Sequence, residues 1–254
     1  MWELTLSINQ DKKEVLDYLF VKLEPQIKFN KGIIIKYQEN RRNKVSLAVP
    51  KKQKEYFLLF ILELVSDVIA TSYKSEYIEN NITQVFADPL KQTAFVSALT
   101  AFDKQTDIDL IKKQLILTGE LNIDGFYYFK LALLRDRWED VCRLVSENQM
   151  NLKIKGASNE LIKFLVKSSQ TSAIEMHVYK NDRVFYLTDA TSIPIKTMNN
   201  NISSESLLIK TIINFCPARI VIHGDILDEK TQSLINQLFE ERLSLCGSEA
   251  TINR

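Results

Sequence analysis

The chain has 254 residues, of which 45% are hydrophobic and 26% are charged, with only six glycines and five prolines. This composition is typical of a globular protein and excludes long disordered or low-complexity segments. Lys and Arg total 33 against 32 Asp and Glu. The whole molecule therefore has no strong field that would attract nucleic acid or an anionic membrane.

The cysteines indicate the compartment. The chain has three cysteines, Cys142, Cys216 and Cys246, and no two of them form a C-x-x-C pair. Because the number is odd and the spacing is wide, we expect neither a disulfide framework nor a zinc knuckle. All three are predicted to be small buried hydrophobic residues. The N-terminus lacks the basic and apolar regions of a signal peptide. These features predict a cytoplasmic protein.

The first part of the chain has the pattern of a strand, a helix and a hairpin. Residues 2–8 alternate between apolar and polar, which predicts a strand. A helix is predicted over 12–23, and Pro25 is expected to end it. The stretches GIIIKY and KVSLAV then flank a polar turn, as in a β-hairpin.

The middle of the chain is predicted to be helical. A long helix is expected over 52–80. Its most apolar stretch, 56–70, is interrupted by two acidic residues and is shorter than the ~20 residues that a spanning helix needs. It is therefore predicted to be a core helix, without membrane association. Asp88-Pro89 begins another helix, with Asp as the cap and Pro in the first turn. Asn122 caps a helix running to 148.

The last part returns to strands. Residues 173–179 and 183–189 flank a turn and predict a second hairpin. A strand over 219–223, a helix over 228–241 and a strand over 243–246 follow. A strand, helix and strand of these lengths predict a parallel pair with a right-handed crossover.

These elements predict a mixed α+β fold in three parts. They are an N-terminal α/β segment at 1–50, a helical bundle at 51–150 and a C-terminal α/β domain at 155–254. Whether the first and last parts share one sheet is left open.

The stretch RIVIHGDILDE, 219–229, is the one that most resembles an active site. His223 and Asp225 follow a predicted parallel strand, where ligands bind in open α/β sheets, and they could hold a metal. His177, the only other histidine, could meet His223 across the sheet. The simpler interpretation is that Asp228 caps a helix, with Thr231 three residues on.

Motifs for other chemistry are missing from the sequence. There is no G-x-S-x-G elbow, no P-loop and no G-x-G-x-x-G. We therefore predict no catalytic residue, no metal ligand, no cofactor and no enzymatic activity.

Basic residues dominate from 28 to 54, around the first predicted hairpin. Lys36, Arg41, Arg42 and Lys44 could contact phosphates there. The other interpretation is that these charges keep an exposed hairpin soluble and its edge unpaired.

Four consecutive aromatic residues, Phe126, Tyr127, Tyr128 and Phe129, open the helix that Asn122 caps. Four consecutive helical side chains cannot all point into one core stripe. One or two of them must face another layer, another domain or a partner, and Tyr hydroxyls suit a half-wet interface. The segment is therefore a candidate protein interface.

The stretch LNIDGFYYFKLALLRDRWEDV, 121–141, resembles the YtxC-like family of sporulation proteins, in its Leu-Asn, acidic residue, Gly-Phe and aromatic-basic helix. The ending at 218–246 also resembles that family, with a strand, a helix and a short strand closing on Arg242 and Cys246. The resemblance implies a cytosolic protein of endospore-forming bacteria. It transfers no enzymatic activity, cofactor or catalytic residue.

The sequence thus leads to three hypotheses. The first is a cytoplasmic accessory protein, connected with sporulation, that binds an unidentified protein or a second copy of itself. The second is a nucleic-acid-binding protein that uses the basic hairpin. The third is a metal-dependent hydrolase that uses His223 and Asp225.

Overall fold

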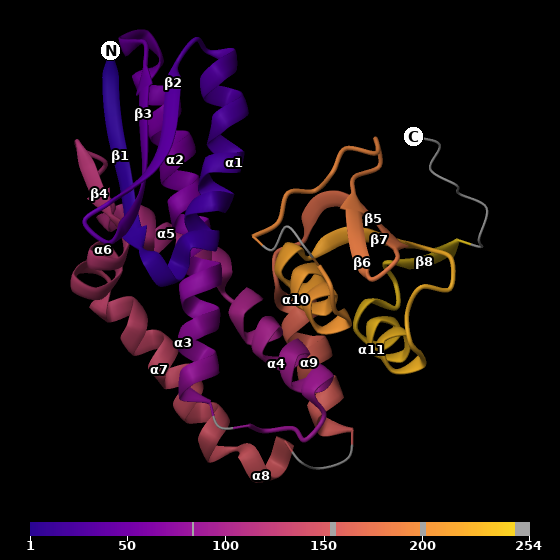
Figure 1. The fold of residues 1–254 in the computed structure, drawn as a ribbon. Coiled ribbons are helices and arrows are strands. Elements are labelled where there is room, and N and C mark those ends of the chain that lie inside the picture. The colour runs from indigo at the N-terminus through magenta and orange to yellow at the C-terminus, as the bar shows by residue number, and fades with distance from the viewer. Residues whose placement is uncertain (83, 153–155, 199–201, 247–254) are drawn as a thin grey trace. The chain divides into compact units, whose positions relative to one another are not determined.

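A computed structural model of the chain describes residues 1–82, 84–152, 156–198 and 202–246. It confirms the mixed α+β fold and contains two separate four-stranded sheets, so the first and last parts of the chain do not share one sheet. The chain folds into two compact units (Figure 1). The first comprises Met1–Lys74 and Gln105–Glu139, and the second comprises Ser75–Lys104 and Asp140–Arg254.

This division differs from the three predicted segments. The helical middle, predicted as one part at 51–150, contributes to both units. The physical reason is that each sheet has an apolar face that needs helices, so the helices of the middle are shared between two cores.

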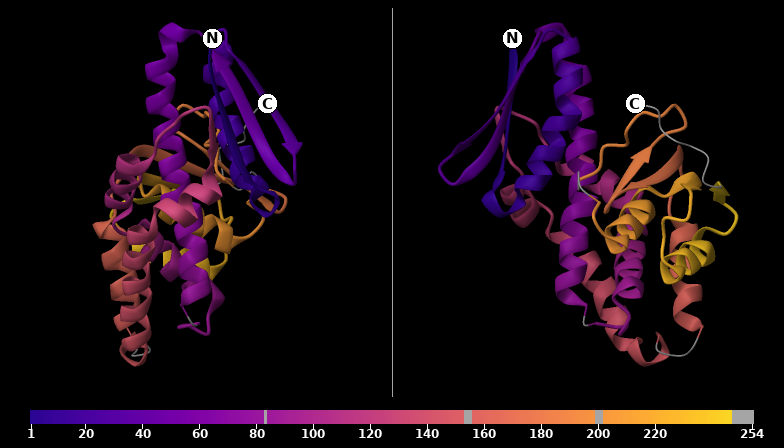
Figure 2. Two further views of the ribbon diagram at one scale, coloured as in Figure 1. Left: turned by 90° about the vertical axis from the view of Figure 1, so that its left-hand side faces the viewer. Right: turned by 45° about the vertical axis from the view of Figure 1, so that its right-hand side comes forward.

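The first unit is built on a sheet with the order β2-β3-β1-β4. β1 pairs antiparallel with β3, and β3 pairs antiparallel with β2. The consecutive strands β2 and β3 form a long hairpin (Figure 2). Its elements are β1 (Trp2–Asn9), α1 (Lys13–Phe29), β2 (Ile33–Glu39), β3 (Arg42–Val49), α2 (Lys54–Val68), α5 (Lys104–Gln114), β4 (Glu120–Asn122), α6 (Ile123–Lys130) and the start of α7 (Ala132–Glu147).

One face of this sheet forms the core of the first unit. Leu4, Leu6 and Ile8 of β1 are buried, as their alternation predicts, and α1 packs on the sheet. The prediction that Pro25 ends the helix is wrong. α1 continues to Phe29 with Pro25 inside it, because Pro25 is exposed while Leu23 and Ile27 on either side are fully buried. Their burial offsets the cost of the proline, about 3 kcal/mol.

Two features around Asn122 differ from the prediction. Glu120–Asn122 forms a short strand, β4, parallel to β1. Three residues are too few for a periodic pattern, so the sequence did not indicate it. The single helix predicted from Asn122 to 148 is broken at Leu131 into α6 and α7. Asn122 does cap α6, since its Oδ1 accepts from the backbone N–H of Gly125 at 2.9 Å.

The long helix predicted over 52–80 runs continuously from Lys51 to Asn81. It includes a π-helical turn at Ile69–Tyr73 and ends with α3 (Lys74–Asn81). By length and composition alone it could cross a membrane, and half of its most apolar window is buried. A core helix of a soluble protein has the same properties, so the finding does not assign a membrane.

The second unit has a sheet with the order β6-β5-β7-β8. β5, β7 and β8 are parallel, as predicted for the last two, and β6 pairs antiparallel with β5. Its elements are α4 (Pro89–Ala101), α8 (Gln149–Leu152), α9 (Ala157–Ser168), β5 (Ser172–Asn181), β6 (Val184–Thr188), α10 (Glu205–Phe215), β7 (Pro217–His223), α11 (Glu229–Phe239) and β8 (Leu243–Cys246).

One face of the second sheet is apolar and the other is mostly polar. Met176 and Val178 of β5 and Ile220 and Ile222 of β7 are buried in one core with residues of α4, α9, α10 and α11. The side chains that alternate with them point to the opposite face, where Val221 is buried, His177 is half-buried and Arg219 is exposed. Parallel sheets normally have both faces covered by apolar layers, so this polar face is unusual.

Candidate functional site

The polar face of the second sheet brings together the two histidines of the chain. His177 on β5 and His223 at the end of β7 are separated by 46 residues in sequence. Val178 pairs with Ile222, so the side chains of His177 and His223 emerge on the same face of neighbouring strands. Their atoms Nδ1 and Nε2, respectively, lie 2.9 Å apart. The sequence left open whether these residues meet.

Three neighbours fix the rings of the two histidines. Nε2 of His177 lies 3.0 Å from Oε1 of Glu175, and the other oxygen of Glu175 lies 3.6 Å from Arg219. The ring of Tyr179 stacks on that of His223, with 4.2 Å between centroids and 11° between planes. We call Glu175, His177, Tyr179, Arg219 and His223 the imidazole cluster.

The electrostatics favour a neutral His223. Burial and then the positive charge available to His177 lower the pKa of His223 below its usual value. Nδ1 of His223 is buried and has no hydrogen-bond partner among the residues that the structure describes. In the neutral state one ring must donate and the other accept across the 2.9 Å contact, so the cluster holds its histidines as a hydrogen-bonded pair.

Asp225 is not part of this cluster and lies exposed in the turn after β7. In the described part of the chain, no three His, Cys, Asp or Glu side chains are placed to hold one metal ion. The predicted helix cap is confirmed, because Oδ1 of Asp228 accepts from the backbone N–H of Thr231 at 2.7 Å. The geometry therefore does not assemble the His223 and Asp225 site of the hydrolase hypothesis.

The cysteines match their prediction only in part. Cys142 and Cys216 are free and buried, as expected for small hydrophobic residues, but Cys246 is exposed. Cys246 lies in the edge strand β8, where it pairs in register with His223. An edge strand has a neighbour on one side only, so its side chains are covered less.

The aromatic segment divides into a buried and an exposed half. Phe126 and Tyr127 are 8% and 5% exposed, whereas Tyr128 and Phe129 are 52% and 84% exposed. Tyr127 packs on Tyr73 and Trp138, with centroids 4.8 and 6.1 Å apart. As the helical geometry required, the four rings do not share one core.

The backbone beneath the exposed rings is held in place. The guanidinium of Arg135 donates to the carbonyl oxygens of Tyr127 and Tyr128 at 2.5 and 2.8 Å, at the point where α6 ends. Leu133, four residues after Phe129 and at the start of α7, is 74% exposed. We call Tyr128, Phe129 and Leu133 the aromatic surface.

The basic hairpin does not present a continuous positive surface. Arg42 is paired with Asp124 at 2.9 Å and its side chain is 24% exposed. Lys44 lies between two carboxylates, those of Glu39 and Glu120, and is 12% exposed. Lys36 also forms an ion pair, with Asp17 at 2.8 Å. Arg41 is exposed in the turn of the hairpin. The nucleic-acid hypothesis requires Arg41, Arg42 and Lys44 to be exposed together on one positive surface, and of these three only Arg41 is exposed.

Sequence reasoning missed a buried polar network in the first unit. Asp124 is 3% exposed and accepts hydrogen bonds from the backbone N–H of Asn9 and the hydroxyl of Tyr73, at 2.7 and 2.8 Å, besides its ion pair with Arg42. These partners come from three distant segments, so no local pattern could have indicated them.

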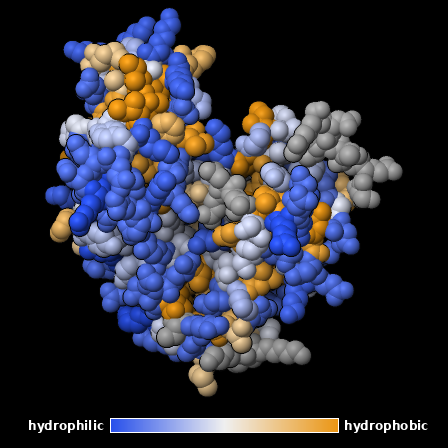
Figure 3. Space-filling model, viewed as in Figure 1, coloured by the Kyte–Doolittle hydropathy of each residue, from blue (hydrophilic) through white to orange (hydrophobic). Residues whose placement is uncertain are grey.

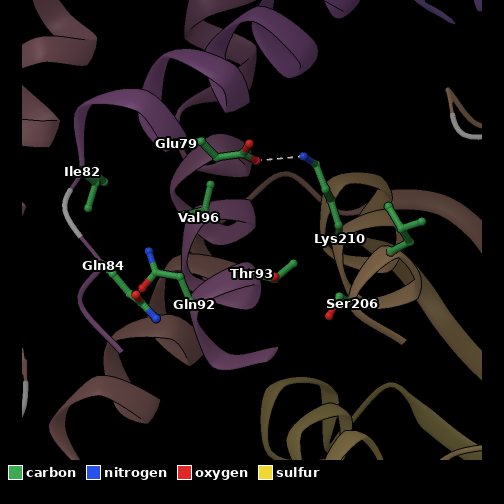
Figure 4. A pocket seen from close by; sticks show the side chains of 9 residues that line it. Glu79, Ile82, Gln84, Gln92, Thr93, Val96, Ser206 and Lys210 are labelled. Atoms are coloured by element: carbon green, nitrogen blue, oxygen red, sulfur yellow. Dashed lines mark hydrogen bonds and ion pairs between the residues drawn. The ribbon is translucent and has the colours of Figure 1, made fainter. Parts of the chain in front are cut away.

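Two hollows lie within the second unit. One, of about 480 Å³, is lined by residues of α3, α4 and α10, and an ion pair between Glu79 and Lys210 at 2.9 Å spans it (Figure 4). The other, of about 750 Å³, includes Lys91 and Ser158. Lys91 donates to the hydroxyl of Ser158, and burial lowers the pKa of Lys91. Ser158 is only 3% exposed, so its hydroxyl is a buried acceptor rather than an open nucleophile.

Comparison with known proteins adds one finding. No curated protein matches the chain, and no solved structure matches it. The model of the YtxC-like family matches residues 56–244, which is well over half of the chain and includes both the aromatic surface and the imidazole cluster. The chain therefore belongs to the YtxC-like family.

Proposed function

We propose that this protein is a non-enzymatic, cytoplasmic accessory protein of sporulation that acts by binding another protein through the aromatic surface. The observation that carries the proposal is the exposure of Tyr128 and Phe129, at 52% and 84%, next to two aromatic residues that are buried. The association with sporulation rests on the family alone.

Covering the exposed rings with a partner protein would lower the free energy, because it removes their apolar area from water. Covering an aromatic side chain stabilises a complex by roughly 1.5–3 kcal/mol through apolar area. Aromatic residues are also enriched among the few that dominate binding energy. Because Arg135 fixes the carbonyls of Tyr127 and Tyr128, the rings are presented on an ordered backbone, which lowers the entropy lost on binding.

The surroundings of the aromatic surface indicate the chemistry of the partner. Lys130 follows Phe129 and is exposed. A partner that buries two adjacent rings and places carboxylates at the rim of that contact would complement both the apolar area and the ammonium group. We therefore expect a protein with an apolar pocket bordered by Asp or Glu.

A second apolar area of the first unit provides a matched control. It lies where α1 ends and β2 begins, and its apolar side chains are visible in Figure 3. Phe29 there is 86% exposed, almost the same as Phe129. Phe29→Ser therefore removes about as much exposed phenylalanine surface as Phe129→Ser would, at a different place.

The test compares tagged full-length protein, the double variant Tyr128→Ser/Phe129→Ser and Phe29→Ser as baits in extracts of sporulating cells. We expect one protein to be recovered with the unchanged chain and with Phe29→Ser but not with the double variant. The recombinant partner must then bind the purified unchanged chain and Phe29→Ser more tightly than it binds the purified double variant. Equal binding of the double variant would contradict the proposal.

A further inference from the structure

We infer that His177 and His223 form a binding site for a divalent transition-metal ion, with Zn²⁺ as the first candidate. The site lies on the polar face of the second sheet, and it does not depend on the proposed role of the aromatic surface in the first unit. It differs from the site considered from the sequence, because its two ligands are the histidines and Asp225 takes no part.

The first argument is the direction of the two ring nitrogens. Nδ1 of His177 and Nε2 of His223 face each other at 2.9 Å and share one proton in a hydrogen bond, so an ion that replaces this proton meets both nitrogens. Two Zn–N bonds of 2.0–2.1 Å at a tetrahedral angle place the nitrogens about 3.3 Å apart. To admit the ion, the nitrogens need to separate by about 0.4 Å, and both rings need to turn so that their lone pairs converge on the ion instead of facing each other head-on.

The second argument is the set of groups behind the ligands. A metal-binding histidine usually donates its other N–H to a carboxylate, which fixes the tautomer and orients the ring. His177 has this arrangement, since its Nε2 lies 3.0 Å from Glu175, and Arg219 lies 3.6 Å behind Glu175. With Nε2 protonated, Nδ1 of His177 is the nitrogen left to bind the ion.

The ring of His223 is also held in position. Its stacking on Tyr179, at 4.2 Å and 11°, restrains the rotation that would turn Nε2 away from His177. Both ligands are on strands rather than loops, and sites built on strands are positioned more precisely.

The two histidines leave coordination positions open. No third His, Cys or carboxylate in the described ranges completes the site, so water or a small anion would fill the remaining positions. Imidazole suits Zn²⁺, Cu²⁺ and Ni²⁺. A site with open positions is exchangeable, unlike the closed four-ligand sites that hold a fold together.

The sequence makes this inference unusually easy to test, because the chain has only two histidines. Metal-free full-length protein is titrated with ZnCl₂ by calorimetry in the Cys246→Ser background, so that the exposed thiol opposite His223 does not contribute. We expect one ion per chain with micromolar affinity. Each of His177→Gln and His223→Gln should weaken binding at least tenfold, while Cys246→Ser alone should leave it unchanged.

A second measurement reads the ligand atoms directly in the protein with both histidines present. Two-bond ¹H–¹⁵N spectra contain only two imidazole systems. Zn²⁺ should shift Nδ1 of His177 and Nε2 of His223, while Nε2 of His177 stays protonated and the proton of the His223 ring moves to Nδ1. Absence of zinc binding would overturn the inference and leave only a hydrogen-bonded pair. So would binding that persists in the His→Gln variants or disappears in Cys246→Ser.

Discussion

Lys74 and Asp107 form an almost fully buried ion pair in the first unit. Nζ and Oδ2 are 2.7 Å apart, and the two side chains are 4% and 2% exposed. The same oxygen accepts from the indole N–H of Trp138 at 3.1 Å. The chain leaves the first unit after Lys74, returns at Gln105 and leaves again after Glu139, so the cluster ties together all three places where the chain changes unit.

Breaking this pair should be costly, because one buried charge would lose its partner. We expect Asp107→Ala to lower the free energy of unfolding by about 3–5 kcal/mol, whereas Lys74→Met/Asp107→Leu should come close to the unchanged protein. Lys112→Met, which removes a more exposed ion pair with Glu63, should cost less than about 1 kcal/mol. Urea unfolding measures all three. A double variant as unstable as Asp107→Ala would contradict this account.

The basic hairpin gives a second prediction, since two adjacent arginines have different surroundings. Arg42→Glu places a carboxylate against the buried Asp124 and removes the hydrogen bond to Asn9. We expect it to destabilise the protein by about 3 kcal/mol or more. Arg41→Glu should change stability by less than about 0.5 kcal/mol, because Arg41 is exposed.

Thermal and urea unfolding of the two arginine variants check this contrast. Equal losses of stability would show that Arg42 is not anchored by Asp124. The contrast also identifies the correct variant for any nucleic-acid binding test. Arg41→Glu changes the surface charge alone, while a loss of binding in Arg42→Glu would report disturbed folding as well.

Asp228 gives a prediction for pH. The hydrogen bond that the backbone N–H of Thr231 donates to its carboxylate lowers the pKa of Asp228 below its usual value. A carboxyl group whose pKa is lower in the folded state stabilises the protein above its unfolded pKa, and this stabilisation is lost as pH falls. Asp228→Ala should therefore cost about 1 kcal/mol at pH 7, and its difference from the unchanged protein should shrink below about pH 4.

The pH series compares the urea midpoints of the unchanged chain and Asp228→Ala from pH 7 to pH 3. Asp228→Asn is the control, since it keeps a capping oxygen without the charge and should show a smaller, pH-independent loss. A constant difference between Asp228→Ala and the unchanged protein across the whole range would rule out a role for the ionised cap.

Gly32, between α1 and β2, gives a prediction about packing. A Cβ at this position would lie 2.8 Å from the carbonyl oxygen of Ala48 and 2.9 Å from side-chain carbons of Ile27 and Val49. The neighbours are backbone and core, so they cannot move aside easily. We expect Gly32→Ala to destabilise the protein by about 1–3 kcal/mol in urea unfolding. A neutral effect would show that the turn relaxes.

What the sequence predicted correctly depends on local chemistry. The caps Asp88, Asn122 and Asp228 were identified because a cap needs only a side-chain oxygen and the next turn of helix, and all three accept the expected backbone N–H. The strand β1 was identified because its alternation shows which side is buried.

What the sequence missed depends on contacts between distant residues. β4 exists because β1 offers a free edge beside it, and Asp124 is stable in the core because Asn9, Arg42 and Tyr73 converge on it. The contact between His177 and His223 follows from the register of β5 and β7. Periodicity shows which face a residue occupies but not which residue of the next strand lies beside it.

The most direct test of the proposed function is photocrosslinking from position 129. The full-length chain would carry a photoreactive phenylalanine analogue there, and a second version would carry it at position 29, where Phe29 is equally exposed. The account predicts a defined crosslinked protein in sporulating cells from position 129 only, lost when Tyr128 and Leu133 are changed to Ser. The same adduct from both positions, or none from position 129, would contradict it.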